Sequence, residues 1–253
     1  MTVKELYDKL SAVISEDLCE EWDNDGIMCC PDLSSEVSRV LVTLDVTEEI
    51  VDYAISRGFD LIVSHHPLIF RPVSKINEEN HISRKLIKLI SNGISVFSFH
   101  TRADKVKGGV NDILARIIGL VDVSPFGEGG LGRIGTLPQE TDLDVFADGV
   151  KRALSSDCVK IADAYNPVKR VALVGGDGKD YVNAALDMGA DTYLSGRISY
   201  NIMEEATDMG INLIEAGHYF TEFPVTGFFA SLVSGFDANV TVEIADSNMI
   251  KTI

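Results

Sequence analysis

The feature that most constrains the fold is a repeated alternation of short apolar runs with amphipathic segments. In the first half, apolar runs at 40–44, 61–63 and 94–99 are each typical of a buried strand. Between them lie segments with helical spacing and clear end signals, such as the one that Thr47 caps and Gly58 ends. Such alternation requires crossover connections, so the sequence predicts an α/β protein with mixed, mostly parallel sheets flanked by helices.

The second half repeats this pattern. Strand-like runs at 171–174, 192–194 and 211–216 again alternate with helical segments. When Gly58 is aligned with Gly189, the order of elements agrees and five positions are identical. We therefore expect two similar α/β units related by internal duplication. The identical positions are Val51, Ala54, Gly58, Asp60 and Ser64 in the first half, and Val182, Ala185, Gly189, Asp191 and Ser195 in the second.

The stretch at 122–138 differs from both halves because it is rich in glycine and contains Pro125 and Pro138. This composition is typical of a boundary or an irregular connection. We therefore expect residues 1–125 to form the first unit and residues 126–253 to form the second, with the C-terminal strand able to return to the first unit.

Composition argues against several classes of function. The chain has 253 residues, with 22 Lys+Arg against 39 Asp+Glu and a formal net charge of −17. Nucleic acids and anionic membranes bind clustered cations, so we expect neither as a partner. No apolar run reaches the roughly 18 residues of a membrane span, and the N-terminus lacks the apolar core of a signal peptide. The four cysteines form no C-x-x-C pair, which favours free thiols in the cytoplasm.

Four of the five histidines follow predicted strands. His65 and His66 end one strand directly, and Pro67 breaks it, so that the two adjacent side chains can reach one site. His100 and His218 each follow another strand and stand four positions before a carboxylate. Because α/β proteins place ligands at the carboxyl ends of parallel strands, these side chains indicate a common site.

Imidazole and carboxylate groups are the ligand set of Zn, Fe, Mn, Co and Ni. Five such ligands exceed the three that are usual at one catalytic zinc ion, and they suit two divalent ions about 3.5–4 Å apart. A lone histidine is more often a hydrogen-bonded structural residue, which is what we expect of His81. The predicted metal ligands are His65, His66, Asp104, His218 and Glu222.

A phosphate cradle is an alternative interpretation of the segment 175–178, which follows a strand and precedes a helix. However, Tyr181 stands where G-x-G-x-x-G requires its third glycine. Lys179 is followed by Asp180 and not by the hydroxyl residue of a P-loop. We therefore expect only a tight strand-to-helix turn.

The motifs together resemble the YbgI-type dinuclear-metal family, whose members are named GTP cyclohydrolase I type 2 homologues or "interacting factor three"-like proteins. The resemblance covers nearly the whole chain. It implies that Glu222 bridges the two ions, and that His100 is a nearby catalytic group or one that supports the metal ligands. It also implies that the protein is a ring-shaped homohexamer. The matching segments are 22–26, 64–70, 100–104, 108–111 and 217–222.

The resemblance further implies a metal-dependent hydrolase that uses a metal-activated water on a small-molecule substrate, with GTP as the substrate in the family label. Arg197 and Asn201 depart from the family, which often has an acidic residue and a histidine there. Arg197 could bind an anionic group or pair with a nearby acid. The alternative function is a non-enzymatic metal-binding or regulatory interaction protein, similar to a metal chaperone. DNA binding is a third option, against which the net charge argues.

Overall fold

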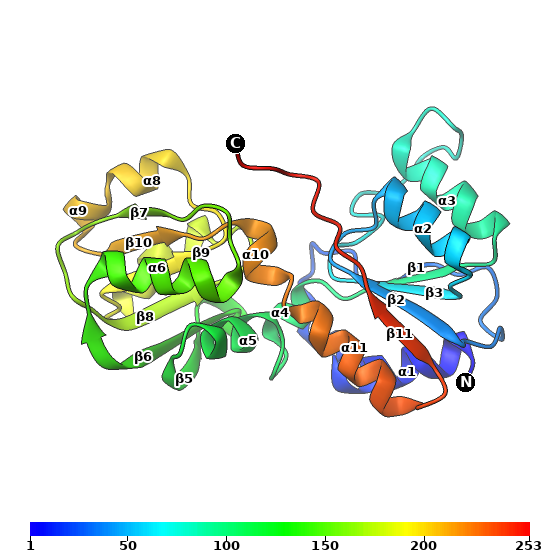
Figure 1. Cartoon of the computed structure of the whole chain (residues 1–253), viewed down its shortest axis with the longest axis horizontal. Helices are drawn as coiled ribbons and strands as arrows, with labels where there is room; N and C mark the ends of the chain where they lie inside the picture. Colours follow the sequence, from blue (N-terminus) through cyan, green and yellow to red (C-terminus); the bar gives the residue numbers. More distant parts are fainter. The chain divides into compact units, whose positions relative to one another are not determined.

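The computed structural model describes all 253 residues and contains two compact α/β units (Figure 1). The first unit comprises Met1–Val106 and Val225–Met249. The second comprises Lys107–Pro224 and Ile250–Ile253. Each unit has one sheet with helices against it, which confirms the predicted α/β class.

The sheet of the first unit has the strand order β1-β4-β3-β2-β11. Its strands β2, β3, β4 and β11 run parallel, while β1 pairs antiparallel with β4 at one edge. The C-terminal strand β11 therefore completes the sheet of the first unit beside β2. The strands are β1 (Gly26–Cys29), β2 (Arg39–Thr43), β3 (Leu61–Ser64), β4 (Ser95–Ser98) and β11 (Thr241–Ile244).

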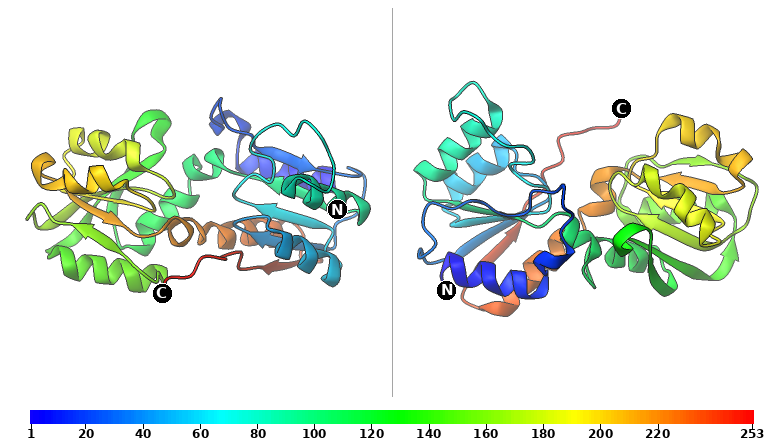
Figure 2. Two further views of the ribbon diagram at one scale, coloured as in Figure 1. Left: turned by 90° about the horizontal axis from the view of Figure 1, so that it is seen from above. Right: turned by 180° about the vertical axis from the view of Figure 1, so that it is seen from behind.

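Helices cover both faces of this sheet (Figures 1 and 2). Because successive strand residues point to opposite faces, Leu41, Ile62 and Val96 share one core with α2 and α3. The other face carries α1 and α11, where Phe229 packs against Phe99 with ring centroids 5.9 Å apart. The helices are α1 (Val3–Val13), α2 (Glu48–Arg57), α3 (His81–Ser91), α4 (Thr101–Lys105) and α11 (Val225–Phe236), with the short 3-10 helix η1 (Glu16–Leu18).

The sheet of the second unit has the order β5-β6-β8-β9-β10-β7. Only β8, β9 and β10 are mutually parallel, so this sheet is more mixed than the first. The glycine-rich stretch at 122–138 lies inside this unit, where it forms most of the antiparallel pair β5 and β6. The strands are β5 (Val121–Phe126), β6 (Gly132–Thr141), β7 (Lys160–Ala162), β8 (Val168–Val174), β9 (Thr192–Ser195) and β10 (Asn212–Glu215).

Alternation again divides the core of the second unit in two. Val171 and Leu173 pack with α5 and α6, whereas Ala172 and Val174 pack with α7 and the α9 region. The longest helices of the chain have 12 residues, and none is long and apolar enough to cross a membrane. The helices are α5 (Val110–Ile117), α6 (Leu143–Leu154), α7 (Val182–Asp187), α8 (Tyr200–Glu204), α9 (Ala206–Met209) and α10 (His218–Glu222), with 3-10 helices η2 (Glu128–Gly130) and η3 (Lys179–Tyr181).

The aligned residues occupy equivalent places in the two units. Gly58 and Gly189 follow the helices α2 and α7 with positive φ angles of 65° and 73°. The carboxylates of Asp60 and Asp191 each accept two backbone N–H groups at the start of the preceding parallel strand. The units therefore share a framework, while duplication as its origin stays a prediction.

Candidate metal centre

The carboxyl end of β3 carries the two adjacent histidines. The strand ends at Ser64, whose hydroxyl donates to the carbonyl of His66 over 2.9 Å and so stabilises a turn. A regular strand would point His65 and His66 to opposite faces. In the turn, their ring centroids lie only 5.0 Å apart.

Hydrogen bonds fix the tautomers of both rings. Nδ1 of the buried His65 lies 2.9 Å from the carbonyl oxygen of Phe99, and Nδ1 of His66 lies 2.7 Å from Oδ1 of Asp45. A carbonyl or carboxylate oxygen only accepts, so each Nδ1 carries the hydrogen, and Nε2 of the neutral ring bears the lone pair. Asp45 is held in turn by Ser247, whose hydroxyl accepts the Asp45 N–H. Carboxylate and carbonyl partners of this kind orient metal-binding imidazoles.

His100 completes a group of three imidazoles. Each ring of His65, His66 and His100 offers one nitrogen, and these three atoms lie within 4.8 Å of one another. Asp104 follows on α4, and its Oδ1 lies 3.6 Å from Nε2 of His65. This distance exceeds a hydrogen bond and suits two ligand atoms that face a common point. The first unit thus brings together four of the residues that the sequence singled out.

The turn after η1 holds His100 through Asp23. The Asp23 carboxylate accepts from Nδ1 of His100 over 2.8 Å, and from the N–H and hydroxyl of Thr101. Burial raises the pKa of Asp23, but the hydrogen bonds from His100 and Thr101 outweigh it and bring the pKa down to about 2. Asp23 is therefore ionised at neutral pH and keeps the hydrogen of His100 on Nδ1.

Asp25 anchors the other end of this turn. Its carboxylate accepts the backbone N–H of His100 over 2.8 Å and Nε of the buried Arg102 over 2.6 Å. Cys19, Asp23 and Asp25 also place potential ligand atoms within 4.8 Å of one another. Burial raises the pKa of the Cys19 thiol, and both carboxylates already accept several hydrogens. We therefore assign this group a structural role, and all four cysteines are free.

In the second unit, His218 and Glu222 lie one turn apart on α10. Nε2 of His218 is 2.9 Å from Oε2 of Glu222, whose side chain is only 6% exposed. The turn after β8 makes room for this carboxylate. Gly176 has a positive φ of 64°, and a Cβ there would lie 2.0 Å from Oε1 of Glu222. The glycine turn at 175–178 therefore accommodates Glu222.

Two other sequence features lie outside these groups. Arg197 is 70% exposed and lies 4.0 Å from the carboxylate of Asp177, so it forms the ion pair that was one of its two expected roles. His81 is exposed at the start of α3 and lines a separate cavity of the first unit.

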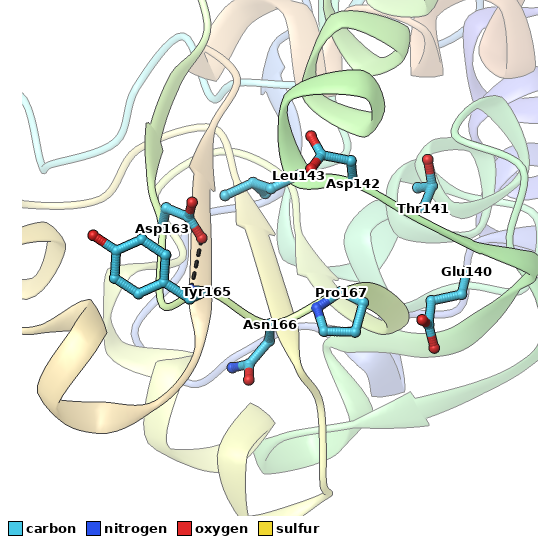
Figure 3. Close-up of a pocket in the computed structure, with 8 residues that line it drawn as sticks. All are labelled: Glu140, Thr141, Asp142, Leu143, Asp163, Tyr165, Asn166 and Pro167. Atoms are coloured by element: carbon cyan, nitrogen blue, oxygen red, sulfur yellow. Dashed lines mark hydrogen bonds between the residues drawn. The ribbon is translucent and has the colours of Figure 1, made fainter.

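A further pocket lies in the second unit (Figure 3). Three of its eight lining residues are acidic: Glu140, Asp142 and Asp163. The Asp142 side chain caps α6, and Asp163 accepts the backbone N–H of Tyr165 over 2.7 Å. No histidine or cysteine lines the pocket, and two of its carboxylates stabilise local backbone. We therefore do not count it as a metal centre.

Comparison with known proteins identifies the family. The sequence model of Duf34/NIF3 (NGG1p interacting factor 3) matches residues 1–252. The chain belongs to the Duf34/NIF3 family. This confirms the resemblance that the motifs indicated.

Individual relatives of this Duf34/NIF3 protein cover most of its length. A Clostridium perfringens protein named GTP cyclohydrolase 1 type 2 homolog is 34% identical over 232 residues, which is 89% of this chain and 88% of its own. A Staphylococcus aureus hypothetical protein of known structure has a TM-score of 0.90 at 27% identity, covering 100% of this chain and 99% of its own. The solved structure of the protein ybgI has a TM-score of 0.88 and covers 98% and 99%, but at 20% identity it shows the fold alone.

Sequence reasoning missed the aspartates that hold the histidines of this Duf34/NIF3 protein. Asp45 follows β2 directly, so the rule that ligands gather at the carboxyl ends of parallel strands could have found it. Asp23 and Asp25 lie in the segment 22–26, which matches the family motif but was assigned no role in the site. Since His100 and Asp23 are 77 positions apart, no local pattern shows their pairing.

Proposed function

We propose that this Duf34/NIF3 protein binds two divalent metal ions and acts as a metal-dependent hydrolase. The observation that carries the proposal is the group of three imidazoles in the first unit. In His65 and His66, Nδ1 lies on an oxygen acceptor and Nε2 bears the lone pair, which is how proteins orient imidazoles that bind a metal. His100 has the same arrangement through Asp23, which leaves its Nε2 to accept a proton beside them. Asp104 adds a carboxylate to the same group.

We propose the ligands that the sequence indicated, with Glu222 as the bridge between the ions. The geometry inside each unit supports this choice. Nε2 of His65 and Oδ1 of Asp104 face each other over 3.6 Å, and Nε2 of His218 lies 2.9 Å from Oε2 of Glu222, so each unit places an imidazole nitrogen beside a carboxylate oxygen. The complete set is His65, His66, Asp104, His218 and Glu222. The metals that suit it are Zn, Fe, Mn, Co or Ni.

When bound, such ions lower the pKa of a water molecule and polarise a substrate oxygen. We propose that His100 moves the proton at its Nε2 atom. Asp23 holds the hydrogen on Nδ1 and, being ionised, stabilises the imidazolium that forms when Nε2 accepts a proton. Asp25 and Arg102 fix the backbone at His100, so the ring is positioned before substrate arrives.

Metal content per subunit tests the proposal. Protein loaded with Mn, Fe or Zn and freed of excess metal should contain two equivalents, measured by plasma mass spectrometry. His66→Ala should lose metal, and His81→Ala is the matched control because His81 lies outside the group. A metal content of zero would return these histidines to structural roles.

Turnover tests the hydrolase. Because the relatives are named GTP cyclohydrolase 1 type 2 homolog, GTP is the first substrate to assay, followed by other nucleotides, pterins and phosphoesters. Activity should disappear in Glu222→Gln. Metal that exchanges rapidly with a chelator, in a protein without turnover, would assign the alternative function of a non-enzymatic metal carrier or regulatory partner.

We also propose a cytoplasmic homohexamer, as the resemblance implies. Sedimentation equilibrium should give six times the chain mass of 27.5 kDa. We propose no DNA partner for a chain of net charge −17. DNA affinity that fell steeply with salt would contradict this.

A further inference from the structure

Two large aromatic side chains stand exposed beside His100 in the first unit. Trp22 is 64% exposed and Phe70 is 46% exposed. Their ring centroids lie 6.3 Å apart, and they lie 6.3 and 6.2 Å from the ring of His100. Both rings meet the imidazole edge-on, at interplanar angles of 83° and 89°. Two exposed aromatic rings therefore lie against the imidazole that we propose to move protons.

Hydrogen bonds hold the segments that carry these two exposed rings. Trp22 directly precedes Asp23, whose carboxylate binds His100 and Thr101. The side-chain amide of Asn24 donates to the carbonyl of Ile69, the residue before Phe70. The segments that carry the two rings are thus tied to each other and to His100. Aromatic rings held in water forgo the stabilisation of burial, which a planar ligand would restore.

Two cations share a cavity with Phe70. Phe70 lines a cavity of about 640 Å³ with the exposed side chains of Arg71 and Lys75, and its acidic lining residue is Glu79. Two cations at one cavity are notable in a chain with net charge −17. An aromatic surface next to cations fits a ligand that combines a planar ring with an anionic group.

We propose that Trp22 and Phe70 form a platform that binds the planar heteroaromatic ring of the substrate, with its anionic group on Arg71 and Lys75. This inference rests on the proposed function in one respect: that function makes the bound ring a substrate that lies next to the reacting groups. Ring binding itself needs no metal, so the two ideas can fail separately.

The chain offers its own probe, because Trp22 is its only tryptophan. Indole fluorescence is followed while protein, with and without metal, is titrated with GMP, guanosine and ribose 5-phosphate. GMP should quench Trp22 in both forms, guanosine should bind about tenfold more weakly, and ribose 5-phosphate should leave the fluorescence unchanged. Phe70→Leu should weaken GMP binding by about tenfold to a hundredfold, which corresponds to one lost stacking contact.

Controls separate stacking from damage to the fold. Trp22→Phe keeps an aromatic ring and should retain GMP binding in calorimetry, whereas Trp22→Leu should lose it. Tyr200→Leu removes a ring that is 77% exposed in the second unit, and it should change nothing. Circular dichroism checks that each variant is folded.

Three results would overturn the platform. The first is equal quenching by ribose 5-phosphate, and the second is unchanged GMP binding in folded Phe70→Leu. The third is fluorescence that depends on protein concentration and not on nucleotide, which would show that a second copy of the chain covers the rings. GMP binding in a protein that takes up no metal would keep the platform and refute the proposed metal function. Two metal equivalents in a protein that does not bind GMP would support the metal function and refute the platform.

Discussion

The carboxyl ends of β3 and β9 occupy equivalent places in the two units and carry different chemistry. Both strands end in a buried serine, Ser64 or Ser195, but two histidines follow the first and Gly196 follows the second. A Cβ at Gly196 would lie 2.5 Å from Oγ1 of Thr221 and 2.6 Å from the carbonyl oxygen of Gly176. The second unit therefore has no room for a side chain at the position that corresponds to His65, and its histidine and carboxylate come from α10.

The two His-x-x-x-carboxylate elements are also equivalent in sequence, but their side chains have different partners. His218 lies against Glu222 of its own helix, whereas His100 binds Asp23, and Asp104 approaches His65 instead. Identical sequence spacing thus gives two local arrangements, because the neighbouring segments differ. The comparison teaches that the framework is common to both units, and that the side chains packed against each strand end determine its chemistry.

The largest effect should come from removing His65. This side chain is fully buried and converges with three other potential ligand groups, whereas His218 is 43% exposed. We expect His65→Ala to weaken metal binding by more than about a hundredfold, and His218→Ala to weaken it less. Isothermal titration with Zn or Mn measures both. Equal losses would show that the two units contribute alike and would break the comparison.

The aspartate behind His66 should matter next. Asp45→Asn replaces an obligatory acceptor by a group that can also donate, so it no longer fixes the tautomer of His66. We expect metal affinity to fall by about tenfold to a hundredfold. The same titration checks this, with Asp142→Asn as control because Asp142 only caps α6. Unchanged affinity in Asp45→Asn would remove His66 from the ligand set.

Alanine substitutions at two glycines with nearly equal φ angles distinguish the effect of backbone strain from an effect on the metal site. Gly176 and Gly58 have φ angles of 64° and 65°, but only at Gly176 would a Cβ meet Glu222, while nothing lies within 4 Å at Gly58. Alanine should cost about 1–2 kcal/mol of stability at either position because the left-handed backbone is strained. Only Gly176→Ala should also weaken metal binding, by about tenfold. Equal metal affinity in both variants would show that Glu222 does not need this space.

The smallest effect concerns the shared framework. Asp60→Ala and Asp191→Ala each remove a carboxylate that accepts two backbone N–H groups. We expect each to lower the free energy of unfolding by about 1–2 kcal/mol and to leave metal affinity unchanged. Urea unfolding measures the loss. Clearly unequal losses would argue that the two carboxylates are not structurally equivalent.

Local signals in the sequence account for much of the fold. Thr47 caps α2, and Gly58 ends it, as predicted, because both act through their own backbone neighbourhood. A local signal also starts α3 at His81, because the Asn80 side chain accepts the N–H groups of Ile82 and Ser83. The helices α6 and α11 were not predicted. In α11 apolar residues dominate, so no clear amphipathic period marks it.

The candidate site was predictable where its groups follow strands and not where its partners are distant. His65, His66 and His100 stand at strand ends, which the apolar runs reveal. Asp25 meets Arg102 across 77 positions, and no sequence period encodes such a contact. The stretch at 122–138 was interpreted as a boundary or an irregular connection because its glycines are rare in strands. Most of it forms β5 and β6, which pair with each other, and β6 also pairs with β8.

The return of β11 to the first unit also determines when the centre can form. Ser247 follows this strand and binds Asp45, from which it is 202 positions away, and Asp45 orients His66. During synthesis, the N-terminal two hundred residues therefore leave the ribosome before the support for His66 exists. Closing so long a loop costs chain entropy that the strand pairing of β11 with β2 must offset. Metal loading should thus follow the completion of the chain, and a nascent chain would hold its histidines only loosely ordered.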